Sequence, residues 1–143
     1  MLELTMAAVA GTDAGSTAGM LMAEAPSEPG AVLRVGRDRA VCRLATPEDW
    51  LFVSRVHLEF RCGAGGAWRV TWLRGSQPEP SAEVRLTFGA QGGAPGRAQL
   101  GAQGGGPLGY GATAELPRGG SGEIVVRDRT SPRSLSVGFY HEV

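Results

Sequence analysis

Two short segments of the sequence hold the residue types that could do chemistry. Gly36-Arg37 ends the apolar stretch that begins at Leu33, and Ser54-Arg55-Val56-His57 opens the next one. A serine hydroxyl beside an imidazole is the nucleophile and base of many hydrolases. On an extended chain, however, a spacing of three residues places Ser54 and His57 on opposite faces. No acidic residue stands at a suitable spacing to orient the imidazole, so the sequence disfavours an enzyme.

The sequence predicts neither a metal site nor a nucleotide cofactor. Its two cysteines, Cys42 and Cys62, form no cluster with His57 or His141 at the spacing of metal ligands. The glycines between positions 104 and 111 lack the strand and helix that a dinucleotide-binding fingerprint requires. We therefore expect no cofactor. Two cysteines are also too few for a disulfide framework, so we expect a reduced, cytoplasmic setting.

Short β-strands are the elements that must position these side chains. Apolar and polar residues alternate, or β-branched residues cluster, in runs at Leu2 to Met6, Leu33 to Val35, Val56 to Phe60, Trp68 to Trp72, Val84 to Phe88, Ile124 to Val126 and Leu135 to Phe139. Turn residues separate the runs, and Gly11, Gly15 and Gly19 disfavour a helix before a further strand at Ala18 to Ala23. Such spacing favours an all-β sandwich or barrel. We expect the face of Trp68, Val70 and Trp72 to be buried, because two indoles supply much apolar area.

Residues 89–113 interrupt this pattern. They contain ten of the 23 glycines of the chain and few bulky apolar side chains. Burial of so little apolar surface cannot offset the conformational entropy lost on ordering. We therefore expect a mobile Gly-rich loop insertion at 89–113 within a single domain that spans residues 1–143.

The charge balance restricts the partners. Fourteen arginines, with no lysine, face fourteen acidic residues, so the formal net charge is zero. Binding to nucleic acid or to an anionic membrane surface needs a clustered positive field, and the sequence predicts neither partner. No run of about 18 apolar residues is present to span a bilayer. Glu3 stands where a signal peptide would carry basic residues, so no signal peptide is expected.

Taken together, the two segments resemble the motifs of forkhead-associated (FHA) domains, a family of β-sandwich modules that bind phosphothreonine. The family pattern is an apolar strand ending in Gly-Arg, a spacer, and Ser-Arg-x-His at the start of another strand. A turn, an aromatic strand and a loop with Gly-Ser-x-Asn-Gly then follow. The matching residues here occur in that order: Gly36-Arg37, Ser54-Arg55-Val56-His57, the turn Gly63 to Gly66, the strand Trp68 to Leu73, and Gly75-Ser76. The specific motifs occupy residues 33–76, and the flanking strands extend the resemblance over the whole chain.

The resemblance implies a two-sheet β-sandwich of about 10–11 strands that binds a phosphothreonine-containing protein or peptide and is not an enzyme. A phosphate with a charge near −2 suits the planar guanidinium of Arg37, which can donate two parallel hydrogen bonds that lysine cannot reproduce. The Ser54 hydroxyl would donate to another phosphate oxygen. Arg55 stands where the family often has a second basic contact, although the side chain can equally face solvent.

The remaining roles implied by the resemblance concern the loops. Gly75 and Ser76 would line the last binding loop. Gly36 would allow a close backbone approach or an unusual φ before the first loop. His57 would support the binding loops through hydrogen bonds, as a structural histidine.

The sequence departs from the family at Pro78-Glu79, where Asn-Gly is expected. The asparagine would hydrogen-bond the main chain of the bound peptide, which proline cannot do, and the Glu79 carboxylate would repel phosphate. Two functions therefore stay open on one fold. The first is a phosphothreonine-dependent interaction module, in bacterial Ser/Thr-kinase signalling or as a domain of a larger regulator. The alternative is a phospho-independent scaffold or oligomerisation module.

Overall fold

A computed structural model of the chain describes residues 1–9, 17–46, 48–75, 79–88 and 106–142. The described residues form eleven β-strands and a single turn of 3-10 helix at Ala64–Gly66. The strands are β1 (Leu2–Val9), β2 (Thr17–Ala25), β3 (Val32–Gly36), β4 (Leu44–Ala45), β5 (Leu58–Cys62), β6 (Trp68–Trp72), β7 (Ala82–Phe88), β8 (Gly106–Leu108), β9 (Thr113–Glu115), β10 (Ser121–Asp128) and β11 (Ser134–His141). No helix in this part of the chain has the length and apolar character needed to cross a membrane.

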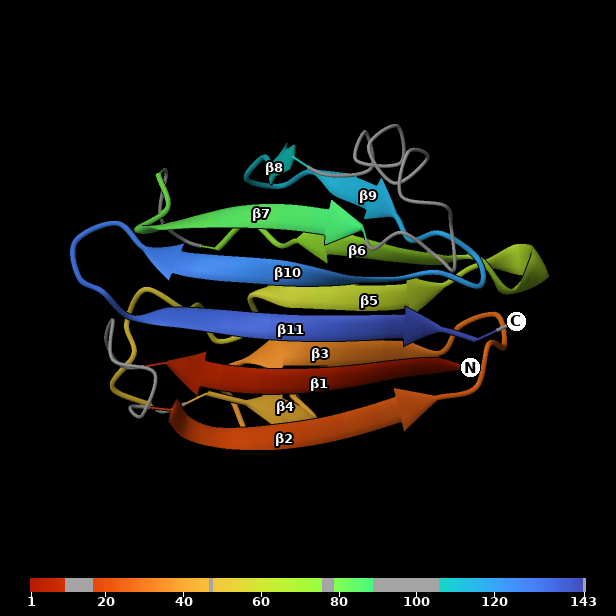
Figure 1. Cartoon of the computed structure of the whole chain (residues 1–143), viewed down its shortest axis with the longest axis horizontal. Helices are drawn as coiled ribbons and strands as arrows, with labels where there is room; N and C mark the ends of the chain where they lie inside the picture. The colour runs from red at the N-terminus through yellow and green to blue at the C-terminus, as the bar shows by residue number, and fades with distance from the viewer. Residues whose placement is uncertain (10–16, 47, 76–78, 89–105, 143) are drawn as a thin grey trace, which may run out of the picture.

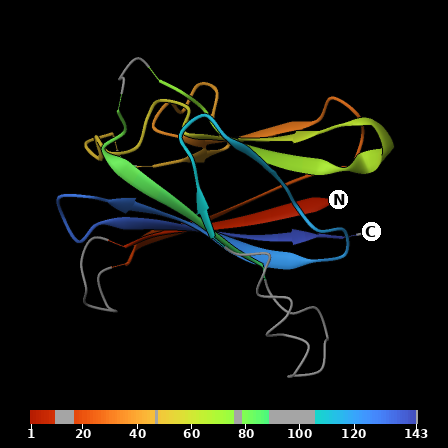
Figure 2. The ribbon, with the colours of Figure 1, turned by 90° about the horizontal axis from the view of Figure 1, so that it is seen from above.

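Two sheets pack face to face, as Figure 2 shows from above. One sheet has six strands in the order β2-β1-β11-β10-β7-β8, and the other has five in the order β4-β3-β5-β6-β9 (Figure 1). All neighbouring strands are antiparallel except β3 and β4, which are parallel. The predicted all-β, two-sheet sandwich of 10–11 strands is therefore confirmed.

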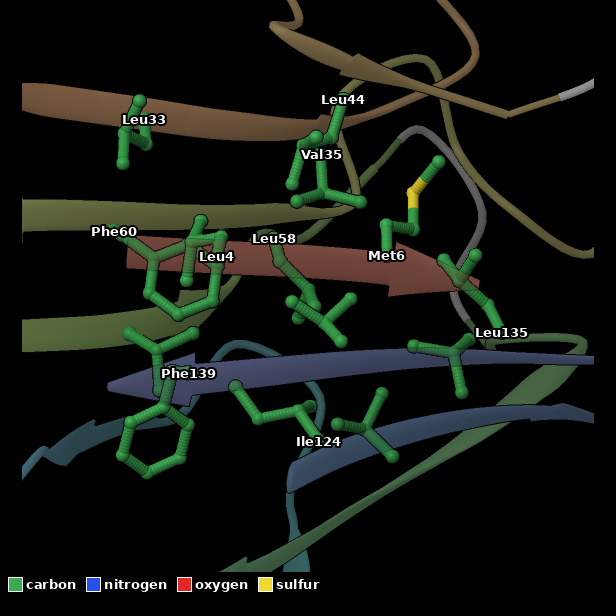
Figure 3. Close-up of a cluster of buried hydrophobic side chains, with 14 of the residues drawn as sticks. Leu4, Met6, Leu33, Val35, Leu44, Leu58, Phe60, Ile124, Leu135 and Phe139 are labelled. Carbon is green, nitrogen blue, oxygen red and sulfur yellow. The ribbon is translucent and has the colours of Figure 1, made fainter. Parts of the chain in front are cut away.

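The core lies between the two sheets and follows from the alternation in the sequence. Successive side chains of a strand point to opposite faces, so every second residue enters the space between the sheets. Figure 3 shows Leu33, Val35, Leu58 and Phe60 of the five-stranded sheet facing apolar side chains of the other sheet. The face of Trp68, Val70 and Trp72 is buried as predicted, with at most 3% of any of these side chains exposed.

The structure corrects the sequence analysis in two places. Residues 106–113, assigned to the Gly-rich loop, contain strand β8 and the first residue of β9. Residues 89–105 lie outside the described residues. Cys42 lies in the loop between β3 and β4, whereas Cys62 ends β5; both are buried free thiols. The run predicted at Val56 to Phe60 forms a strand only from Leu58 onward, and His57 precedes this strand and is almost completely buried.

Candidate functional site

Three loops meet at the end of the sandwich opposite the two chain termini (Figure 1). They are the segments between β3 and β4, between β4 and β5, and between β6 and β7. A hollow of about 460 Å³ opens there, and its wall includes Arg37, Ser54, Arg55 and Gly75. The structure thus brings together four of the five residues predicted to contact a phosphopeptide. The fifth, Ser76, lies outside the described residues.

Gly36 allows the first two loops to lie against each other. A Cβ atom on Gly36 would stand 2.2 Å from the carbonyl oxygen of Arg55, which is a severe clash with backbone. The main chain uses this close approach, because Arg37 N donates to Ser54 O at 3.1 Å and Asp38 N donates to Arg55 O at 3.0 Å. Of the two reasons for glycine that the sequence left open, the close approach applies, since φ at this position is not left-handed.

The guanidinium of Arg37 is held in place by the second loop. Its Nε donates a short hydrogen bond to the Val53 carbonyl, and Nη1 donates to the Glu48 carbonyl at 3.4 Å. The side chain is half-buried, and Nη2 has no hydrogen-bond partner among the described residues. An arginine fixed in this manner loses less conformational entropy when it binds an anion, because its planar fork is already oriented.

His57 lies beneath the second loop and orients it. Ser54 N donates to His57 Nδ1 at 2.9 Å, which places the imidazole proton on Nε2. The ring is 1% exposed and stacks on Trp72 with a centroid distance of 5.5 Å. Burial lowers the pKa of His57 to about 4, so the ring is neutral at physiological pH.

The arrangement of Ser54 and His57 differs from that of a nucleophile and a base. The bond that joins them comes from the Ser54 backbone, and no hydrogen bond links its hydroxyl to the imidazole in the described part of the chain. The geometry therefore supports a structural task for His57, although the ring is not fully satisfied. Neither His57 Nε2 nor Trp72 Nε1 has a hydrogen-bond partner among the described residues, and both atoms are buried.

Arg55 is exposed and stands between two hollows. It lines the first hollow together with Arg37, and both arginines also line a neighbouring hollow that contains Arg39, Asp38 and Glu48. No carboxylate lies within ion-pairing distance of Arg55 in the described residues. The Arg55 guanidinium is therefore available to a ligand in either hollow.

The third loop is held by a residue that the sequence analysis overlooked. Gly75 N donates to the hydroxyl of Tyr110 at 2.7 Å. Tyr110 also packs edge-on against Trp72, and the Arg74 guanidinium lies 4.9 Å from the centre of the tyrosine ring. The signal in the sequence was one aromatic residue between two glycines within a segment otherwise poor in large side chains.

The first hollow is electrostatically positive although the chain has no net charge. Arg37 and Arg55 line it, and none of its lining residues in the described chain is acidic. Glu79, which the sequence analysis placed against the phosphate, is exposed and is not part of the wall. Two guanidinium groups, one of them pre-oriented, and a neighbouring hydroxyl can donate several hydrogen bonds to a tetrahedral anion.

Comparisons with known proteins place this architecture in a class. No family model matches the sequence, and no curated protein matches it. Among solved structures, the N-terminal FHA domain of S. cerevisiae Rad53p, in complex with a phosphothreonine peptide, is similar over 96% of this chain and 93% of that chain, at 14% identity and a TM-score of 0.55. An engineered FHA domain with a Myc-pTBD peptide covers 96% of this chain and 91% of its own, at 16% identity and a TM-score of 0.52.

These similarities define the fold. The chain is a two-sheet β-sandwich whose candidate site is built by the loops at one end. Its overall fold is similar to that of these FHA domains, as the resemblance of the sequence motifs predicted.

Proposed function

We propose that this chain is a non-enzymatic interaction module that binds phosphothreonine in a partner protein. The observation that carries the proposal is the hollow lined by Arg37, Ser54 and Arg55, with no carboxylate in its described wall. The Rad53p FHA domain is described in complex with a phosphothreonine peptide and the engineered FHA domain with a Myc-pTBD peptide, which supports a phosphopeptide as the partner.

In the proposed complex, Arg37 supplies the principal contact to the phosphate. Its Nη2 is unpartnered among the described residues, and the guanidinium is already held by the carbonyls of Val53 and Glu48. Ser54 donates its hydroxyl, and Arg55 adds a second guanidinium from the same loop. Gly36 and His57 support the site through the contacts between loops rather than through the ligand. Gly75 lines the hollow, and Ser76, outside the described residues, is proposed to contact the peptide as well.

We propose further that residues 1–143 form one domain, and that this domain acts in bacterial Ser/Thr-kinase signalling or as a domain of a larger regulator. The proposed setting is the cytoplasm. The proposed partners are phosphothreonine-containing proteins or peptides, and not nucleic acid or membranes.

One observation favours the alternative, a phospho-independent scaffold or oligomerisation module on the same fold. The loop after β6 has Pro78-Glu79 in place of Asn-Gly. In the same loop, the Gly75 N–H is already occupied by the Tyr110 hydroxyl. Fewer groups are therefore free to hold the main chain of a peptide.

A phosphothreonine peptide library separates the two functions. The chain is titrated against the library, against the same peptides without phosphate, and against the phosphoserine forms. The proposal expects binding that requires the phosphate and that disappears in Arg37→Ala. Equal binding of phosphorylated and unphosphorylated peptides contradicts it and favours the scaffold.

A further inference from the structure

A second hollow adjoins the first and continues away from the phosphate-binding residues. It has a volume of about 440 Å³ and lies where β7, β8 and β10 meet. Trp72, Pro80 and Tyr110 line both hollows, so the two are joined at these side chains. A peptide that leaves the first hollow across Pro80 and Tyr110 enters the second one.

The wall of this second hollow is basic. Arg85, Arg127 and Arg129 line it, with Glu83 as the one carboxylate among its lining residues in the described chain. Glu83 lies 4.0 Å from Arg129 Nε. No carboxylate is within ion-pairing distance of Arg85 or Arg127 in the described residues, and both are exposed. Two positive charges are thus left without a partner beside the proposed phosphate site.

Strand pairing explains why these arginines share one wall. In the six-stranded sheet, Arg127 lies opposite Glu83 and Val125 lies opposite Arg85, while Arg85 lies opposite Pro107 of the short edge strand β8. Arg127 and Arg85 therefore project from adjacent strands on the outer side of the sheet, near the end that holds the loops. Rigid strands fix their positions, which suits recognition of a ligand charge.

Another hollow next to Arg37 and Arg55 has a smaller excess of positive charge. This third hollow is the one described above beside Arg55. It shares Arg37 and Arg55 with the first hollow and contains Asp38 and Glu48 together with Arg39. Acidic groups on a ligand would meet carboxylates there. The third hollow has three arginines against two carboxylates, whereas the second has three arginines against Glu83 alone. Because the phosphate would neutralise Arg37 and Arg55, acidic ligand residues are favoured more strongly in the second hollow.

We propose that the second hollow is a subsite for acidic side chains of the bound phosphopeptide, with Arg85 and Arg127 as the residues that set this preference. This inference rests on the proposed function, because the bound phosphothreonine sets which neighbouring residues of the peptide reach the second hollow. It predicts a ligand class: phosphothreonine flanked, on one side of the chain, by aspartate or glutamate a few residues away.

An aspartate scan tests the subsite. Phosphothreonine peptides with an otherwise alanine background carry one aspartate at each of five positions before or after the phosphate, and their Kd values are measured by fluorescence anisotropy. We expect neighbouring positions on one side to tighten binding about 2- to 5-fold each, as for exposed ion pairs. The double variant Arg85→Ala/Arg127→Ala should lose this gain while it binds the all-alanine phosphopeptide within about 2-fold of wild type.

Two further variants make the scan decisive. Arg69→Ala removes an exposed arginine from the other sheet, where it pairs with Glu115, and should leave the scan unchanged. Arg85→Glu/Arg127→Glu should reverse the preference from aspartate to arginine at the same positions.

The outcomes distinguish the subsite from the proposed function. A flat scan, or a gain on both sides that survives in Arg85→Ala/Arg127→Ala, overturns the subsite while phosphate-dependent binding through Arg37 stands. Absence of binding to every phosphothreonine peptide overturns the proposed function and the subsite with it.

Discussion

Arg37 contacts the loop before β5, and in the proposed function it is also the principal contact to the phosphate. Its Nε and Nη1 hold the carbonyls of the loop before β5, while the proposal gives the remaining donors to phosphate. We expect Arg37→Ala to weaken phosphopeptide binding by about 2–5 kcal/mol, the range for removal of one partner of a buried charge pair. Arg37→Lys should recover only part of this loss, because a point charge lacks the bidentate geometry. Calorimetric titration measures both.

Ser54→Ala is the companion to this variant at the same site. In Ser54→Ala the backbone hydrogen bond from residue 54 to His57 stays. Only the hydroxyl is lost, which should weaken phosphopeptide binding by about 1–3 kcal/mol, the range for a hydrogen bond to a charged group. Thermal unfolding should shift little for Ser54→Ala. If Arg37→Ala binds phosphopeptide as tightly as wild type, the assignment of the phosphate site is wrong.

His57 should make the stability of the fold depend on pH. Its pKa is about 4 in the folded chain because of burial, against about 6.5 when unfolded. Between these values the unfolded state binds one more proton, so the free energy of unfolding rises with pH and is lost as pH falls from 6.5 toward 4. Protonation of this one group should lower the free energy of unfolding by about 3 kcal/mol in total. Above pH 6.5 the histidine contributes no slope.

His57→Asn isolates that contribution. The asparagine Oδ1 can accept the bond from Ser54 N in place of Nδ1, but it does not titrate. Urea unfolding of both proteins at several pH values should therefore show a difference in unfolding free energy that favours wild type at pH 7 and narrows as pH falls to 4.5. A constant difference over this range would show that His57 titrates normally.

Several site residues could be predicted from sequence, while others could not. Arg37, Ser54 and Arg55 lie within local motifs whose residue types reveal their chemistry. Tyr110 lies 35 residues from Gly75, and only the pairing of β8 with β7 and of β9 with β6 brings it back to the site. No local pattern contains that information.

The loop between β3 and β4 can lie against the loop between β4 and β5 only because Gly36 has no side chain. We expect Gly36→Ala to destabilise the fold and to weaken ligand binding, because its Cβ would meet the Arg55 backbone at 2.2 Å and the loops must separate. Overpacking of this kind costs about 1–3 kcal/mol. Denaturant unfolding and phosphopeptide titration measure the two effects.

Gly75→Ala is the matched control from the third loop. A Cβ there would lie 3.6 Å from Ser54 Oγ and from the Tyr110 hydroxyl, which is ordinary van der Waals contact. This variant should unfold within about 0.5 kcal/mol of wild type. Equal destabilisation by both substitutions would mean that the approach at Gly36 is not the cause.

The boundary of the Gly-rich segment lies at Gly106. Leu86 pairs with Gly106, and Val84 pairs with Leu108. The Leu108 side chain is 7% exposed and belongs to the core cluster. Deletion of residues 91–103 should therefore change the unfolding free energy little, because it leaves a short connection between paired strands and closure entropy varies slowly with length. Deletion of 91–109 also removes β8 and should cost about 2–4 kcal/mol, as for the loss of a buried leucine.

Chemical denaturation of the two deletion variants provides the comparison. A large loss of unfolding free energy from the shorter deletion would show that residues 91–103 contribute to the folded state.

The sequence analysis extended the loop to 113 because strands of two or three residues, such as β4, β8 and β9, are too short to show a period. The longer strands, of five or more residues, were predictable, since each contains an alternating or β-branched run.

The charge of the whole molecule and that of the site are distinct. The chain is neutral, yet the first hollow has two arginines and no carboxylate in its described wall, and the second has two arginines without an acidic partner. A neutral molecule exerts little long-range attraction on an anion. If the proposed function holds, selection of a phosphorylated ligand must then occur at short range, where hydrogen-bond geometry discriminates among anions.

This short-range binding should depend on pH through the ligand and not through the protein. Phosphothreonine takes up its second proton near pH 6, which halves the charge that Arg37 and Arg55 face. His57, the buried histidine behind the site, stays neutral down to about pH 4 and adds no charge between pH 5 and 8. Affinity should thus fall as pH decreases from 7.5 to 5.5, with a midpoint at the second pKa of the phosphate. Replacement of the phosphate by a phosphonate of lower pKa should move the midpoint down by the same amount. A midpoint that stays fixed with both ligands would place the titrating group on the protein.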